Sequence, residues 1–155
     1  MADEVFISCD VEADGPIPGP HSMLSLGAVA LDQTGKELGS FQRNLKELEG
    51  AAPDPDTAKW WSTQPEAWEA IRKDLMDPEH VMQEFVRWVS AFPGKPVFVG
   101  YPACYDFTFV YVYIRRFGLA SPFSHSGLDI KTYAMAVMKK PYRESVKKNM
   151  PNRWF

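Results

Sequence analysis

Two acidic residues follow an apolar, strand-like stretch near the start of the chain, in residues 6–14, FISCDVEAD. If the strand continues through Asp10 and Glu12, their side chains share one face, about 6.5 Å apart along the chain. Two ionised carboxylates at that spacing repel each other, and burial strengthens the repulsion. A divalent cation, a basic partner or water at an exposed strand end would relieve it, and carboxylate oxygens suit Mg²⁺ or Mn²⁺. The alternative is that the strand ends at Asp10 and both acids are solvated.

A third acid, Asp106, follows a later strand-like segment in VFVGYPACYDFTFVYVYI. It falls in the first turn of an apolar helix, where an acid also interacts favourably with the helix dipole. If the strand before it adjoins the first strand, Asp106 lies near Asp10. Three acids at one edge of a sheet fit two-metal phosphoryl chemistry, in which paired ions stabilise the attacking and leaving oxygens.

The elements that must position these acids are readable from periodicity and turn residues. Strands are predicted at 5–11, 23–32, 37–45, 94–101 and 127–130, and helices within 53–75 and at 77–92, 104–118 and 131–140. Three strands come first and helices then alternate with strands, which predicts a mixed sheet flanked by helices.

The helix signals are local. Asp77 is expected to cap the helix at 77–92, with Pro78 in its first turn, and its apolar face is Val81, Phe85, Trp88 and Val89. For the shorter helices before it, the expected caps are Asp56 and Thr63, with Pro65 at a first helical position.

Composition indicates one soluble domain. The chain has 155 residues, 45% of them hydrophobic and 24% charged, and a formal net charge of −3. No apolar run approaches the roughly 18 residues that span a bilayer, and no basic leader precedes an apolar stretch. We therefore expect a cytoplasmic protein. Cys9 and Cys104 both lie in apolar contexts, which favours two buried free thiols over a disulfide.

Positive charge gathers at the C-terminal end. Residues 138–155 contain six basic residues and one acid, Glu144, so this segment is strongly cationic on an acidic body. Such asymmetry indicates contact with a polyanion, or else a solvated terminus.

Taken together, DVEADG on a strand, SLGAVALD in the second strand and GYPACYDFTF opening a helix resemble the DEDD-type 3′–5′ exonucleases. Trp60, Trp61 and LDIKT resemble their exoribonuclease-like branch. The resemblance implies an α/β, ribonuclease H-like fold with a mixed five-stranded sheet. It also implies that Asp10, Glu12 and Asp106 are catalytic and hold two Mg²⁺ or Mn²⁺ ions. The implied substrate is the 3′ end of single-stranded nucleic acid, and a homodimer is compatible with the family.

The sequence departs from the family at its third motif, a His or Tyr followed by Asp on a final helix. Counting from Asp106 places that motif near residues 155–166, and no Asp follows Asp129. We expect the domain to be incomplete at its C-terminus, weakly active or inactive in this form, and loosely held over 141–155. His125 and Asp129 are the alternative source of the motif.

Other residues leave alternatives open. One of the two adjacent tryptophans is expected in the core and the other at the site, where Trp61 is the predicted substrate-binding residue, since indoles stack on bases. His21 either contacts phosphate or is a solvated loop residue.

Among other functions, a phosphatase with an Asp nucleophile fits poorly, because the second acid is Glu. A nuclease-like domain that binds nucleic acid or a partner without cutting is the main alternative, and RNA and DNA substrates are not distinguished.

Overall fold

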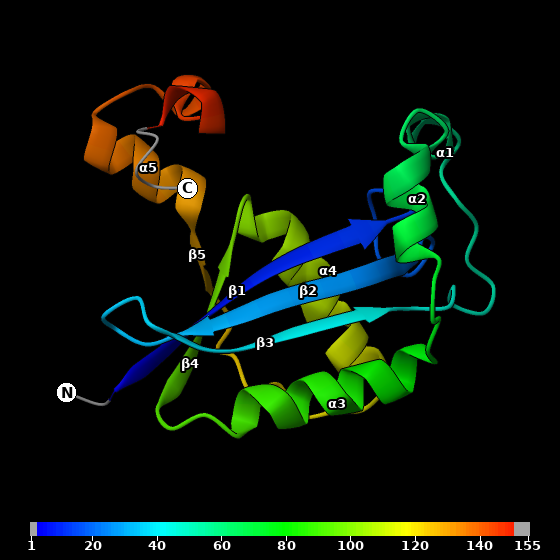
Figure 1. The fold of residues 1–155 in the computed structure, drawn as a ribbon, viewed down its shortest axis with the longest axis horizontal. Helices are drawn as coiled ribbons and strands as arrows, with labels where there is room; N and C mark the ends of the chain where they lie inside the picture. The colour runs from blue at the N-terminus through cyan, green and yellow to red at the C-terminus, as the bar shows by residue number, and fades with distance from the viewer. Residues whose placement is uncertain (1–2, 151–155) are drawn as a thin grey trace.

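The computed structural model describes residues 3–150 and contains one mixed five-stranded sheet (Figure 1). Its order is β3-β2-β1-β4-β5, so β1 lies at the centre. The neighbours β1, β2 and β3 pair antiparallel, and β4 pairs parallel with both β1 and β5. The strands are β1 Glu4–Ala13, β2 Met23–Leu31, β3 Glu37–Asn44, β4 Lys95–Gly100 and β5 Gly127–Asp129. The predicted α/β class and the antiparallel start are confirmed.

Five α-helices and two short 3₁₀ turns complete the described chain. They are α1 Pro55–Trp61, α2 Pro65–Ile71, α3 Pro78–Ser90, α4 Ala103–Arg116, α5 Ile130–Met138, η1 Tyr142–Glu144 and η2 Lys147–Asn149. Helices α3 and α4 contact each other and the sheet, whereas α5 lies beyond β5, well apart from α3 (Figure 1). None of the helices in residues 3–150 is long and apolar enough to cross a bilayer.

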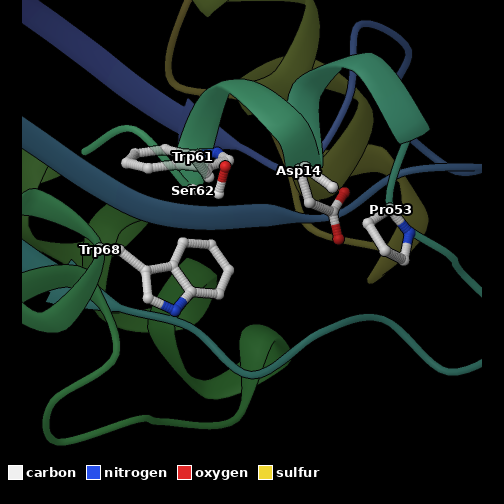
Figure 2. A pocket seen from close by; sticks show the side chains of 6 residues that line it. Asp14, Pro53, Trp61, Ser62 and Trp68 are labelled. Carbon is white, nitrogen blue, oxygen red and sulfur yellow. The ribbon is translucent and has the colours of Figure 1, made fainter. Parts of the chain in front are cut away.

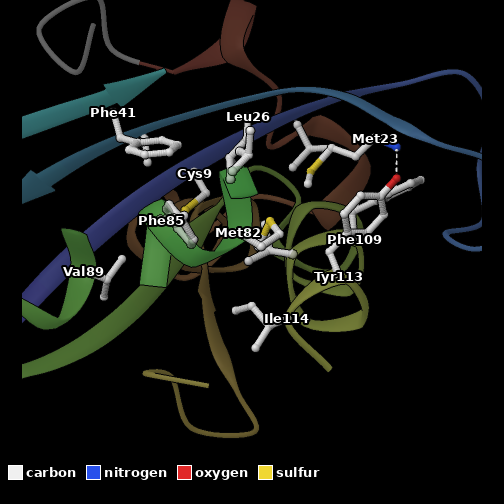
Figure 3. Packing of buried hydrophobic residues seen from close by; sticks show 14 of the residues in the cluster. Cys9, Met23, Leu26, Phe41, Met82, Phe85, Val89, Phe109, Tyr113 and Ile114 are labelled. Atoms are coloured by element: carbon white, nitrogen blue, oxygen red, sulfur yellow. Dashed lines mark hydrogen bonds between the residues drawn. The ribbon is translucent and has the colours of Figure 1, made fainter. Parts of the chain in front are cut away.

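The alternation of β1 explains how the core forms. Ile7, Cys9 and Val11 are buried in one cluster with side chains of α3 and α4, while the residues between them point the other way. Figure 3 shows this packing, in which the Met23 backbone N–H donates to the Tyr113 hydroxyl at 2.6 Å. Because the two residues are far apart in sequence, this bond fixes α4 against the N-terminal end of β2.

Helix caps follow the sequence in part. Asp77 caps α3 by accepting from the N–H groups of Glu79 and His80, as predicted. The residue capping α1 is Asp54 and not Asp56, because the Asp54 side chain accepts from the Thr57 N–H. Gln64, and not Thr63, precedes α2, without a side-chain cap bond.

Two further expectations are wrong. Cys9 is a buried free thiol, but Cys104 is exposed, because it lies on the outer side of the first turn of α4. The segment 141–150 is not loosely held. It forms η1 and η2, with Ser145 and Met150 buried. The rest of that expectation, over 151–155, lies outside the described residues.

Candidate active site

Asp10 and Glu12 lie on the second half of β1, which continues to Ala13. They alternate with the buried Cys9, Val11 and Ala13, so both carboxylates are on the face of β1 opposite the main core. Asp10 is exposed and Glu12 is half-buried. The idea that the strand ends at Asp10 is therefore wrong, and the two acids share one face as predicted.

The third acid reaches this strand from α4. Asp106 is only 3% exposed, and its Oδ1 accepts a hydrogen bond from the Val11 N–H at 3.1 Å. The bond forms because β4 pairs with β1 only up to Ser8 and Val99, after which the chain turns into α4. The Val11 N–H on that side has no partner in β4, and the carboxylate takes its place.

Gly100 makes this approach feasible at the end of β4. A Cβ atom there would lie 2.8 Å from the Ala103 Cα and 3.1 Å from the Asp106 Oδ2. The first distance is too short for a real Cβ atom, so any larger residue would displace the start of α4 and with it Asp106.

Burial and mutual repulsion govern the charge of these acids. Burial raises the pKa of Asp106 to about 6, with Asp10 and Glu12 adding repulsion and the N–H groups of Val11 and Tyr101 opposing it. Burial, and then the Asp10 charge, also raises the pKa of Glu12. The site is thus a set of crowded carboxylates short of positive charge.

The donor set suits hard divalent cations, because it consists of carboxylate oxygens and its ionisation is opposed by burial and like charge. In residues 3–150, however, no three His, Cys, Asp or Glu side chains are grouped closely enough to hold a metal ion. The structure therefore brings Asp106 to the backbone between Asp10 and Glu12, while their roles as ligands and catalysts stay predictions.

The two tryptophans take different environments. Trp61 is 5% exposed and its indole N–H donates to the Ala13 carbonyl at 2.9 Å, whereas Trp60 is 52% exposed. Trp61 and Trp68 face a pocket of about 310 Å³ whose wall also includes Asp14 (Figure 2). Trp61 is thus both a core residue and a pocket wall, and its binding role remains a prediction.

Asp14 is an acid that sequence reasoning passed over. It is buried, and its Oδ1 accepts from the Ser22 N–H at 2.5 Å, while its backbone carbonyl accepts from the Asp54 N–H. Burial raises its pKa. The signal was present, because Asp10, Glu12 and Asp14 recur at every second position.

The alternative third-motif residues, Asp129 and His125, have contacts of their own. Asp129 Oδ2 accepts from the Ala103 N–H at 2.8 Å, and its Oδ1 accepts from the Thr132 N–H at 2.6 Å. One carboxylate therefore caps the starts of α4 and α5, which is a structural role. His125 is exposed, with its ring near Tyr111. His21 braces its loop through a 2.9 Å contact between Nδ1 and the Ala52 carbonyl.

Solved structures of nucleases share this fold. Escherichia coli exonuclease I in complex with a dA16 oligonucleotide superposes with a TM-score of 0.69 at 15% identity, covering 87% of this chain. The nuclease domain of 3′hExo, a DEDDh family member bound to rAMP, gives a TM-score of 0.67 at 12% identity, covering 92% of this chain and 74% of that domain. The chain spans only 30% of exonuclease I. The fold is that of the DEDD exonucleases.

Sequence relatives narrow this class to one family. Residues 5–152 match the 3′–5′ exoribonuclease Rv2179c-like domain, and the chain belongs to that family. It is also 31% identical over 143 residues to the 3′–5′ DNA exonuclease Cap18 of Escherichia coli, covering 90% of this chain and 73% of that protein. DEDD exonucleases depend on divalent metal ions.

Proposed function

We propose that this domain removes nucleotides from the 3′ ends of single-stranded nucleic acid by hydrolysing the terminal phosphodiester, using Mg²⁺ or Mn²⁺. The observation that carries the proposal is the hydrogen bond from the Val11 N–H to Asp106, which holds a buried carboxylate between Asp10 and Glu12. The oligonucleotides in the exonuclease I complexes and the family's exoribonuclease description support a nucleic-acid substrate.

Asp10, Glu12 and Asp106 would hold the ions, and two bound ions supply an activated water and stabilise the attacking and leaving oxygens. Asp106 is fixed by the Val11 backbone, so it forms the rigid side of the site. Asp10 is exposed, which leaves it free to meet a ligand from solvent. Binding would draw the three carboxylates together and would offset both burial and mutual repulsion, which raise the pKa values of Glu12 and Asp106.

The pocket between Trp61 and Trp68 is proposed to take the base of the terminal nucleotide. Its wall is almost entirely apolar, from two indoles, Pro53 and Ala58. It also adjoins the strand that carries the acids, since Trp61 is bonded to Ala13, the residue after Glu12. Stacking on such rings is worth about 1–3 kcal/mol per base and tolerates any base, so the pocket suits an enzyme without strong base preference.

The test compares Asp10→Asn with the wild type on a short oligoribonucleotide and on its DNA counterpart, with Mn²⁺. Asn keeps the shape but removes the charge, so both hydrolysis and Mn²⁺ binding measured by calorimetry should fall, hydrolysis by about 10²-fold or more. Asp56→Asn, an exposed acid on α1, is the matched control. Wild-type Mn²⁺ affinity and unchanged cleavage in Asp10→Asn would sink the assignment.

A further inference from the structure

The end of the described chain is a cationic segment, residues 130–150, which comprises α5, η1 and η2. It has one acid, Glu144, in a chain whose net charge is −3. Its cations are Lys131, Lys139, Lys140, Arg143, Lys147 and Lys148. All are exposed except Lys131, which is half-buried. The positive charge of the segment is thus turned towards solvent.

The backbone that carries these cations is anchored. Ser145 is fully buried, its hydroxyl donates to the Pro141 carbonyl at 3.1 Å, and its own carbonyl accepts from the Tyr101 hydroxyl at 3.5 Å. The Asn149 side-chain amide donates to the Glu144 carbonyl at 2.7 Å, and Met150 is buried. The lysines therefore project from a fixed support, which lowers the entropy cost of binding a ligand.

Aromatic rings alternate with the cations on this surface. Tyr133 is 62% and Tyr142 is 44% exposed. The Lys131 Nζ lies 4.1 Å from the centroid of the Tyr142 ring, and the Lys147 Nζ lies 5.7 Å from that of Tyr101. Exposed rings among cations are the combination that single-stranded nucleic acid requires, because the backbone needs charge and the unpaired bases need stacking surfaces. A duplex has its base faces already stacked and would leave these rings unused.

The segment also reaches the acid site. A pocket of about 430 Å³ is lined by Asp10 and Lys147 together, and Tyr101 and Met150 are also in its wall. A strand whose terminal phosphodiester lies at Asp10 would therefore have the exposed Lys147 in the same pocket.

We propose that residues 130–150 bind the single strand on the 5′ side of the nucleotide being removed. Lys147 contacts the phosphate nearest the acids, the more distal cations contact later phosphates, and Tyr133 and Tyr142 stack on bases. The inference rests on the proposed function for the direction of the strand, because a 3′ end in the acid site leaves only the 5′ side to follow this surface.

The test measures binding without catalysis. A 12-nucleotide RNA and a DNA of the same sequence, each labelled with fluorescein, are titrated with the 155-residue protein in EDTA, and anisotropy is followed from 50 to 200 mM salt. The variants are Lys147→Gln, the triple variant Lys139→Gln, Lys140→Gln and Arg143→Gln, and Tyr142→Ala. The controls are Arg87→Gln on α3 and Lys95→Gln at the start of β4, both exposed.

Removing one cation that neutralises a phosphate should flatten the slope of log affinity against log salt by about 0.7 for a single strand. We expect affinity to fall about three- to tenfold in Lys147→Gln and further in the triple variant, with the controls unchanged. Tyr142→Ala should weaken affinity and leave the salt slope as it is, because stacking releases no counterion. The reduction in affinity should be equal for RNA and DNA if the segment contacts only phosphates and bases. It should be larger for RNA if the segment also contacts 2′-hydroxyls.

Unchanged affinity and salt slope in both the Lys147 and the triple variants would overturn the inference, and so would equal reductions on a blunt duplex of the same sequence. Circular dichroism melting of each variant shows that the fold is retained. The outcome is separate from that of the proposed function. If the protein binds through residues 130–150 but never cleaves with Mn²⁺, only the proposed nuclease activity is refuted. If cleavage depends on Asp10 but neither binding nor cleavage depends on residues 130–150, only the proposed course of the strand is refuted.

Discussion

The carboxylate of Asp106 accepts the Val11 N–H at 3.1 Å, and so completes a strand that β4 leaves unpaired. One side chain thus continues the hydrogen bonding of the sheet and supplies an acid to the site. Asn can preserve the hydrogen bond and remove the charge, whereas Ala removes both. Comparing the two substitutions at Asp106 separates what this residue does for the fold from what it does for chemistry.

The pH dependence of stability follows from burial of Asp106, whose pKa of about 6 lies above the unfolded value. Because the folded state holds the proton of Asp106 more tightly, this residue contributes stability that is fully present below the unfolded pKa and is lost as pH rises through about 6. In EDTA, the free energy of unfolding by urea should fall between pH 4.5 and 7.5 by about 2 kcal/mol more in the wild type than in Asp106→Asn. Mn²⁺ should reduce that loss, because it binds the ionised acid. The same pH dependence in both proteins would contradict the assignment.

Gly100→Ala should displace the first turn of α4, because the new Cβ would lie 2.8 Å from the Ala103 Cα. Overpacking of this kind typically costs about 1–3 kcal/mol, and Asp106 should move with the helix, lowering Mn²⁺ affinity. Gly27→Ala is the matched control, since a Cβ in β2 meets only the Asp10 carbonyl, at 3.9 Å. Calorimetric Mn²⁺ titration and urea unfolding of the two variants make the comparison. Equal behaviour would show that α4 tolerates the shift.

The structural bond of the Trp61 indole and the proposed binding of a base in its pocket can be separated by substitution. Trp61→Phe keeps a ring at the pocket but removes the N–H that Ala13 accepts, so it should lower the free energy of unfolding by about 1–3 kcal/mol. Trp68→Ala should preserve most stability and weaken oligonucleotide binding about tenfold, because this side chain is partly exposed at the pocket. Trp60→Ala, outside the pocket lining, is the control. Denaturation curves measure stability and anisotropy measures binding. Wild-type binding by Trp68→Ala would show that this pocket does not take the base.

Asp129→Ala should loosen the starts of both α4 and α5, since neither capping bond can then form. Removing a helix cap typically costs about 1 kcal/mol, so we expect about 2 kcal/mol by urea unfolding. Asp129→Asn should cost about half as much, because one acceptor oxygen remains. Asp32→Ala, at an exposed turn that accepts from Thr34 and Lys36, removes comparable local bonds far from either helix start. If Asp129→Ala costs no more than that control, the carboxylate does not join the two helices.

The features readable from sequence were those with local causes. The alternation in β1 and the Asp77 cap were predicted because side-chain period and capping act within a few residues. The bond between Asp106 and Val11 was not, because it depends on β4 pairing with β1 only up to Ser8. Sequence also could not decide which adjacent tryptophan is buried, since that depends on the orientation of a seven-residue helix. For Asp129 the sequence shows only an acidic residue, whereas its two hydrogen-bond donors, the N–H groups of Ala103 and Thr132, come from different helices.

The early end of β4 has a consequence for solubility. Past Ser8, β1 has no β4 neighbour, so residues 9–13 pair with β2 on one side and have a strand edge on the other. Exposed edges invite another chain to add a strand, and charged side chains are one way in which natural proteins discourage this. Asp10, Glu12 and the buried Asp106 place negative charge along that stretch. We therefore expect the same acids to discourage strand addition at this edge, so neutralising them should make the protein more prone to self-association even where it stays folded.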